Sequence, residues 1–193
     1  MTAVFRDFYG IFKIRIGIAI ALSAVAGLAV TPGISLPAWQ VAVLGFAALG
    51  ASAAAGAFNQ LIERDLDARM ARTQKRPFVT GRYRGGAVWY LGVLLLLTGS
   101  VTIAGVLFNP LVAVYLFLGA FTYGVVYTVW LKKRTPWNIV IGGLSGTFAV
   151  LAGSAAISPV PGPVPAILAM VLFLWTPPHF WSLAAALKRD YEQ

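Results

Sequence analysis

The 193-residue sequence has no cysteine, a single histidine and only six acidic residues. Without cysteine the chain can form neither a disulfide framework nor a thiolate metal site. Charge is scarce as well, because 11% of the residues are charged, whereas about a quarter are charged in soluble domains. In contrast, 59% of the residues are hydrophobic and the mean hydropathy is +0.80. This composition excludes an ordinary soluble domain and predicts a protein that crosses the membrane several times.

The apolar residues form six stretches that are each long enough to cross a bilayer, since about 20 helical residues span its hydrocarbon core. Turn-forming residues separate several of them, as at Asn109-Pro110 and in the proline-rich run from Pro159 to Pro165. We therefore expect one domain over residues 1–193, an all-α integral membrane helical bundle. The predicted spans lie near residues 14–30, 39–62, 87–108, 111–130, 138–157 and 164–187.

The fifteen lysine and arginine residues fall into four groups along the chain. If the chain crosses the membrane six times, all four groups lie on one side, and the three loops on the other side carry no charge. The tendency of basic loops to stay inside then places both ends of the chain in the cytoplasm. This topology explains the net charge of +9 without a nucleic-acid partner. The same cations could also hold anionic lipid headgroups or a phosphorylated substrate.

Half of the acidic residues lie between positions 63 and 67, directly after an apolar stretch. A helix turns by about 100° per residue, so Asn59, Glu63 and Asp67 are expected within about 80° of one another on one face. Amide and carboxylate oxygens suit Mg²⁺, which usually takes one or two protein carboxylates and completes its shell with water and substrate phosphate. We predict a magnesium site here, which Asp65 joins only if the helix unwinds locally.

Cations follow the acidic residues at Arg72, Lys75 and Arg76. Guanidinium groups match phosphate oxygens with two parallel hydrogen bonds, so metal and arginines together predict a clamp for a diphosphate group. The alternative interpretation is that the carboxylates merely neutralise neighbouring arginines on a solvated loop. The position of the acidic residues at the end of a membrane helix favours the diphosphate site.

His179 is the only histidine and lies in the last apolar stretch, behind Pro177-Pro178. Ionisable groups inside membrane segments are candidates for function. With Trp175 and Trp181 beside it, His179 could ligate a heme iron or hydrogen-bond a porphyrin propionate, and a neutral histidine bonded to another helix is the alternative. Tyr127 shares a helix face with the tyrosine four residues before it, and both a catalytic role and an interfacial anchor stay open.

Three segments resemble a known family. The segment from Asn59 to Pro77, NQLIERDLDARMARTQKRP, is similar to the first acidic motif of the UbiA superfamily of intramembrane prenyltransferases, which usually has aspartate at the position of Glu63. Two others resemble the protoheme IX farnesyltransferase branch in particular, and the resemblance covers most of the chain. They are YGVVYTVWLKKRTPWN from Tyr123 to Asn138 and LWTPPHFW from Leu174 to Trp181.

The resemblance implies transfer of the farnesyl group of farnesyl diphosphate to a vinyl group of protoheme IX, with water adding a hydroxyl group, to give heme O. It makes heme b a substrate rather than a permanent cofactor, makes Mg²⁺ the cofactor, and implies a bacterial inner membrane. Contact with heme A synthase or oxidase assembly proteins is compatible with it but is not indicated by the sequence. The implied roles are metal binding by Asn59, Glu63, Asp65 and Asp67, diphosphate binding by Arg72, Lys75, Arg76 and Lys132, catalysis with Tyr127, and heme binding by Trp175, His179 and Trp181.

The family has nine spans and a second acidic motif, which begins where Asp190 follows the sixth predicted span of this chain. The resemblance therefore implies that residues 1–193 lack the C-terminal third of such an enzyme. It also implies that Asp190 is a further metal ligand from the second motif.

Two other functions are compatible with the same residues. A quinone-pathway aromatic prenyltransferase of the same superfamily would share the diphosphate site but would not need His179. An ion-coupled membrane transporter would use the carboxylates and the histidine to carry ions. Transporter sites usually lie near the bilayer midplane, whereas this acidic cluster is predicted at the cytoplasmic boundary.

Overall fold

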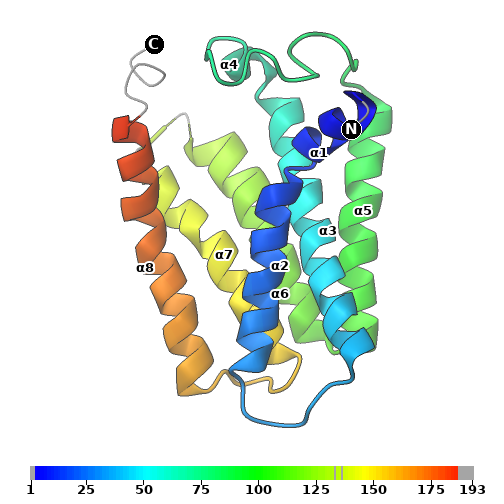
Figure 1. The fold of residues 1–193 in the computed structure, drawn as a ribbon, viewed down its shortest axis with the longest axis vertical. Helices are drawn as coiled ribbons and strands as arrows, with labels where there is room; N and C mark the ends of the chain where they lie inside the picture. Colours follow the sequence, from blue (N-terminus) through cyan, green and yellow to red (C-terminus); the bar gives the residue numbers. More distant parts are fainter. Residues whose placement is uncertain (1–2, 133, 136, 187–193) are drawn as a thin grey trace.

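The computed structural model describes residues 3–132, 134–135 and 137–186, and within these ranges it is a bundle of helices without strands, as predicted (Figure 1). Long helices run side by side, and loops join them at both ends of the bundle (Figure 1). The elements are α1 (Ala3–Ile11), α2 (Ile14–Ala29), α3 (Ala38–Ile62), α4 (Arg64–Asp67), α5 (Ala87–Leu107), α6 (Pro110–Phe121), the π-helix η1 (Thr122–Leu131), α7 (Asn138–Ala155) and α8 (Pro163–Ala186).

Five of the described helices are long and apolar enough to cross a membrane by themselves, namely α3, α5, α7, α8 and the continuous α6–η1 helix. The predicted first span, 14–30, is α2, whose 16 residues are too few to cross alone. Together with α1 it reaches the required length, but the two helices are bent by 51°. The bend lies at Lys13, whose φ of 48° is left-handed and ends the regular helix. The predicted span near residues 14–30 is thus the second helix of a bent pair.

Among the described helices of membrane length, α3 is the most buried. Contacts run around a ring from α2 to α3, α5, α6 and α7 and back to α2, while α8 packs mainly on the outside of α7. In an 18-residue apolar stretch of each helix, 56% of the residues are buried in α3 but only 11% in α5 and in α8. Alanines from Ala47 to Ala57 form most of the buried side of α3. Such small side chains let neighbouring helices approach closely, which matters in lipid because contact between helices has to replace contact with lipid tails.

The closest approach in the bundle is between α2 and α7, where two glycines face the opposite backbone. A Cβ atom on Gly153 would lie 1.8 Å from the carbonyl oxygen of Ala24, and one on Gly27 would lie 2.1 Å from that of Val150. Neither position has room for a methyl group. This contact fixes α2 against α7, and it therefore fixes where the bend at Lys13 lies relative to the rest of the bundle.

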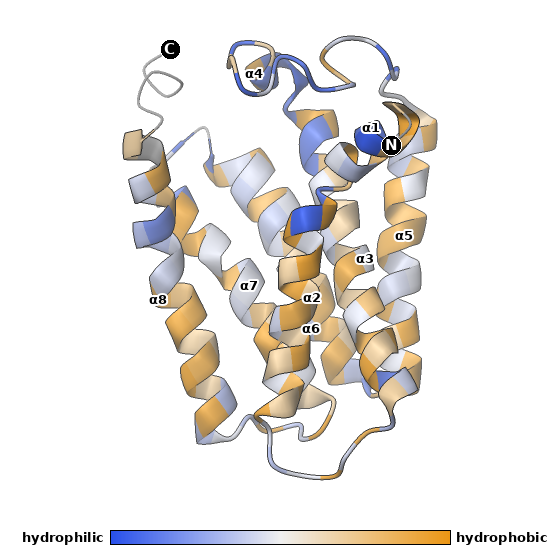
Figure 2. Cartoon of the chain, in the orientation of Figure 1, coloured by the Kyte–Doolittle hydropathy of each residue, from blue (hydrophilic) through white to orange (hydrophobic). Residues whose placement is uncertain are grey.

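Hydrophilic residues gather at one end of the bundle, where α1, α4 and the segment after α4 lie (Figure 2). The loops at the opposite end, 30–37, 108–109 and 156–162, contain no charged residue. In one of these loops, the side chain of Asn109 caps the start of α6 by accepting hydrogen bonds from the backbone of Leu111 and Val112. Its amide group also donates a hydrogen bond to the carbonyl of Ala155 at 2.7 Å. The predicted one-sided distribution of charge is thus confirmed for the described residues, and the cytoplasmic location of that side stays a prediction.

The α2–α7 contact predicts a difference between two glycines of the same helix. We expect Gly153→Ala to destabilise the protein by about 2 kcal/mol and to lower its melting temperature by about 5 °C, because the added methyl group must push α2 away. Gly146→Ala is the matched control, because no atom lies within 4 Å of its new methyl group. Thermal unfolding in detergent micelles measures both. Equal melting temperatures for the two variants would contradict the close packing.

Candidate functional site

The acidic motif lies where α3 ends, and the predicted regular helix through Asp67 is interrupted there. The helix stops at Ile62, and Glu63 has φ −92° and ψ 13° before the short α4 begins. Two backbone hydrogen bonds still bridge the break, from the amide of Glu63 to the carbonyl of Asn59 at 3.0 Å and from Asp67 to Glu63 at 2.8 Å. The four-residue spacing therefore survives, and the three side chains are only 2%, 3% and 4% exposed.

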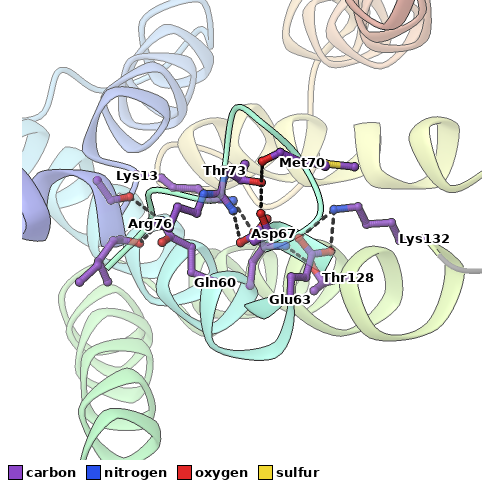
Figure 3. Close-up of polar contacts among 12 residues, drawn as sticks. Lys13, Gln60, Glu63, Asp67, Met70, Thr73, Arg76, Thr128 and Lys132 are labelled. Atoms are coloured by element: carbon purple, nitrogen blue, oxygen red, sulfur yellow. Dashed lines mark hydrogen bonds and ion pairs between the residues drawn. The ribbon is translucent and has the colours of Figure 1, made fainter. Parts of the chain in front are cut away.

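Each of these three side chains meets a cation that comes from a different segment of the chain, as Figure 3 shows around Glu63 and Asp67. The pairs are Lys13 with Asn59 Oδ1, Lys132 with the carboxylate of Glu63, and Arg76 with Asp67 Oδ2. The cations come from the bend between α1 and α2, from the end of η1 and from the segment after α4. Residues far apart in sequence thus form one buried polar cluster.

Glu63 keeps part of its capacity to bind a ligand. Lys132 Nζ lies 2.8 Å from Oε2, with hydrogen-bond geometry, and 2.7 Å from Oε1. Oε1 is buried, and the ion pair with Lys132 is the only polar contact that the described residues give it. A buried carboxylate that is paired with a single lysine can bind a hard cation when that ammonium group turns to another anion.

The π-helix η1 supplies the second side of the cluster. π-helical turns are rare and are often found at functional sites, and they bring residues five apart onto one face. Here Tyr123 accepts a hydrogen bond from Lys13 at its hydroxyl group, at 2.7 Å. Thr128 accepts one from Asn59 Nδ2 at 3.0 Å and donates to the carbonyl of Tyr123 at 2.8 Å. The backbone irregularity therefore places two side chains against the end of α3.

Tyr127 and Lys132 also come from η1 and its C-terminal end. The ring of Tyr127 stacks on that of Tyr123, with centroids 5.6 Å apart and planes 13° apart. Lys132 Nζ lies 5.9 Å from the centre of the Tyr127 ring. The predicted common face of the two tyrosines is thus confirmed, and the structure brings Tyr127 beside the ammonium group that binds Glu63.

The segment after α4 is held over the end of α3 by contacts with α1. Arg82 donates a hydrogen bond to Asp7 at 2.6 Å, and the ring of Tyr83 packs edge-on against Phe8 and Trp89. Thr73 donates to the carbonyl of Asp67 at 2.8 Å. These contacts fold the segment back so that Arg76 reaches the buried carboxylate.

Other predicted ligands are not brought into the cluster. Asp65 is exposed, and the break at Glu63 does not bring it onto the face of Asn59, Glu63 and Asp67. Arg72 and Lys75 are exposed on the segment that carries Arg76. The predicted ligand Asp190 lies outside the described residues.

The predicted acceptor site lies on α8, which continues as a helix through Pro177 and Pro178. The ring of His179 stacks on that of Trp175 with centroids 4.4 Å apart, and both side chains are exposed, as is Trp181. Within the part of the chain that the structure describes, no hydrogen bond holds the imidazole group of His179 to another helix. The structure therefore does not support the interpretation of His179 as a purely structural histidine bonded to a neighbouring helix.

Two members of the cluster were missed by the sequence analysis. Lys13 was counted only as a basic residue before the first span, although a lysine next to an apolar stretch is a usable signal. Thr128 gave no signal, because a threonine in an apolar helix commonly bonds to its own backbone.

The cluster fits a magnesium ion only with help from further ligands. Within residues 3–132, 134–135 and 137–186, no three acidic or histidine side chains come together in a way that could hold a metal ion alone. Two carboxylates and one amide oxygen are nevertheless a hard donor set, and they leave room in an octahedral shell for water and phosphate oxygens. The residues present thus fit a metal ion that arrives with a phosphorylated ligand.

Comparison with known proteins finds close relatives. Protoheme IX farnesyltransferase 2 of Paramagnetospirillum magneticum is 55% identical over 191 residues, which is 99% of this chain and 66% of the relative. Protoheme IX farnesyltransferase 1 of the same organism is 45% identical over 98% of this chain and 66% of its own length. The protoheme IX farnesyltransferase of Parvibaculum lavamentivorans is 42% identical over 97% of this chain and 58% of its own length. No solved structure matches the chain.

The chain thus spans at most about two thirds of the length of these curated relatives. A family model described as the UbiA prenyltransferase family matches residues 20–193, which include α3, the acidic motif, η1 and α8. Several apolar helices long enough to cross a membrane agree with this match. The chain is therefore a multi-pass membrane protein that belongs to the UbiA prenyltransferase family.

Proposed function

We propose that this protein transfers the farnesyl group of farnesyl diphosphate to a vinyl group of protoheme IX in a Mg²⁺-dependent reaction that gives heme O. The observation that carries the proposal is the cluster of three half-buried cations around two buried carboxylates and a buried amide at the polar end of the bundle. The names of the relatives, which are 42–55% identical, support the choice of substrates. The polar end then faces the cytoplasm of a bacterial cell, where farnesyl diphosphate is dissolved.

In the reaction, the bond between the first farnesyl carbon and the diphosphate oxygen breaks, and diphosphate leaves with the electron pair. The first farnesyl carbon forms a bond to the vinyl group, a water molecule adds its hydroxyl group to the neighbouring carbon, and one proton is released. Negative charge grows on the phosphate oxygens as the bond breaks. Arg76 and Lys132 are positioned to stabilise that charge more strongly than they stabilise the intact substrate, which accelerates the step.

Asn59, Glu63 and Asp67 would hold the metal ion. When bound, Mg²⁺ would neutralise the departing diphosphate. The residues of the chain contribute the remainder: Lys13 and Tyr123 close the cluster on the side of α2, and the apolar walls of the bundle keep bulk water from the electron-deficient farnesyl carbon. Arg72 and Lys75, exposed beside Arg76, are proposed to meet the diphosphate as it enters.

His179 is proposed to bind the heme. Its imidazole is held flat against Trp175 at 4.4 Å and is exposed, so that a planar porphyrin can approach it. Trp181 is exposed on the same helix and adds aromatic surface. This acceptor site distinguishes the proposed reaction from that of a quinone-pathway enzyme, which would use the same diphosphate cluster.

The reaction itself is tested with the complete purified enzyme in detergent micelles, supplied with farnesyl diphosphate, Mg²⁺ and protoheme IX. We expect heme O and pyrophosphate in equal amounts, and neither product when a chelator removes Mg²⁺. Prenylation of an aromatic acid with protoheme left unmodified would instead support a quinone-pathway enzyme. Uptake of an ion by proteoliposomes without release of pyrophosphate would support a transporter.

Two neighbouring aspartates offer a matched test of the diphosphate cluster. We expect Asp67→Asn to weaken Mg²⁺-dependent binding of an unreactive farnesyl thiodiphosphate by at least about tenfold, because it removes a buried charge that meets Arg76. Asp65→Asn makes the same change in charge two residues away, but Asp65 is exposed, so this variant should bind within about twofold of the unaltered protein. Calorimetric titration measures both. A larger loss from Asp65→Asn would move the metal site onto the solvent side of α4.

The heme site is tested on α8. We expect His179→Ala to weaken protoheme IX binding by roughly tenfold, because it removes the one imidazole group in the sequence. The Soret absorption band measures this binding. Binding of farnesyl thiodiphosphate should not change. Leu174→Ala alters another exposed side chain of the same helix and serves as the control. Unchanged heme binding by His179→Ala would place the acceptor elsewhere.

A further inference from the structure

A chain of directional hydrogen bonds links Lys13 to the backbone of η1 through the side chain of Asn59. Lys13 Nζ donates to Asn59 Oδ1, Asn59 Nδ2 donates to Thr128 Oγ1 at 3.0 Å, and Thr128 Oγ1 donates to the carbonyl of Tyr123 at 2.8 Å. Asn59 is 2% exposed and Thr128 is 1% exposed, so neither side chain can exchange these partners for bulk water.

The donors and acceptors in this series of hydrogen bonds can be arranged in only one way. The ammonium group of Lys13 has no acceptor lone pair, so it must face the oxygen of the Asn59 amide. The carbonyl of Tyr123 has no proton to donate, so the single hydroxyl proton of Thr128 must point to it. The hydroxyl oxygen of Thr128 is then left as an acceptor, which can be matched only by the NH₂ group of Asn59.

The two groups that bind the Asn59 side chain behave differently in the proposed reaction. Lys13 is a flexible cation whose charge is attracted to a bound diphosphate, and it can leave Asn59 without any change in the backbone. Thr128 is fixed by its bond to η1 and stays in place. Once Lys13 turns to the phosphate, Thr128 is the only group in the described part of the chain that holds the Asn59 NH₂ group.

We infer that Thr128 is a positioning residue that orients the amide of Asn59, so that Oδ1 rather than Nδ2 faces the metal and diphosphate site. The inference rests on the proposed function, because it assigns Oδ1 to a metal ion. An amide turned the other way would present two donor protons to the cation. Thr128 thus acts through Asn59 without touching the substrate.

The inference is tested by a double-mutant cycle that makes the orientation of the amide irrelevant. A carboxylate presents an oxygen in either orientation, so Asn59→Asp removes the need for Thr128 without removing the ligand. Mn²⁺ replaces Mg²⁺ in the presence of farnesyl thiodiphosphate, and the free Mn²⁺ signal in electron paramagnetic resonance measures the affinity. The complete chain in detergent micelles is used throughout.

We expect Thr128→Val to weaken Mn²⁺ binding by roughly tenfold when Asn59 is present, because a turned amide loses its oxygen contact. In the Asn59→Asp background, Thr128→Val should change the affinity by less than about twofold. Thr128→Ser keeps the hydroxyl group and should bind like the unaltered protein, whereas Thr128→Ala should behave like Thr128→Val. This second pair keeps the test valid if Thr128→Val does not fold.

The possible failures are distinguishable. A loss of equal size in both backgrounds would mean that Thr128 supports only the fold, and it would overturn the inference while leaving the proposed function intact. A loss with Thr128→Ser as large as that with Thr128→Ala would overturn it as well. If the unaltered chain binds no Mn²⁺ in the presence of the thiodiphosphate, the proposed metal site fails and the role of Thr128 fails with it.

Discussion

The structure depends on neutralising two carboxylates that are buried at the end of an apolar bundle. An unpaired charge in such surroundings is very costly, and a buried pair is tolerated only with good geometry. Glu63 and Asp67 are 3% and 4% exposed, and each meets a cation from another part of the chain. The surrounding elements can be understood as the means by which Lys132 and Arg76 are brought to those two positions.

The elements that bring the partners of the cluster together depart from regular α-helix. The left-handed Lys13 bends the first span by 51°, Glu63 interrupts the helix before α4, and the last ten residues of the α6–η1 span are π-helical. Elsewhere the spans are ordinary α-helices with apolar surfaces. Local conflicts with regular geometry persist only where the surrounding structure stabilises them, and they often mark functional sites. Their concentration around one cluster is the structural argument that this end of the bundle carries the chemistry.

The sequence was sufficient to predict some of this and not the rest. Long apolar runs predicted α3, α5, the α6–η1 helix, α7 and α8 within one or two residues at their ends. The spacing of Asn59, Glu63 and Asp67 predicted their common edge, because it depends on local periodicity. Two of the partners of that edge come from far along the chain, because Lys13 lies 46 residues from Asn59 and Lys132 lies 69 residues from Glu63. The same periodicity separates Asp65 from Asp67, because only Asp67 falls on the face of Asn59 and Glu63, and the structure shows Asp67 buried and Asp65 exposed.

The balance of charge in the cluster bears on what it can bind first. Lys13, Lys132 and Arg76 contribute three positive charges and Glu63 and Asp67 two negative charges, which leaves a surplus of one positive charge among the five. A free divalent cation would have to displace these cations and enter a site that already repels it. A diphosphate attracts the same cations away from the carboxylates, which frees oxygens such as Glu63 Oε1 for a metal ion. The arrangement therefore favours a metal ion that binds together with a diphosphate, as in a prenyltransferase, and disfavours the binding of a free ion that a transporter would require.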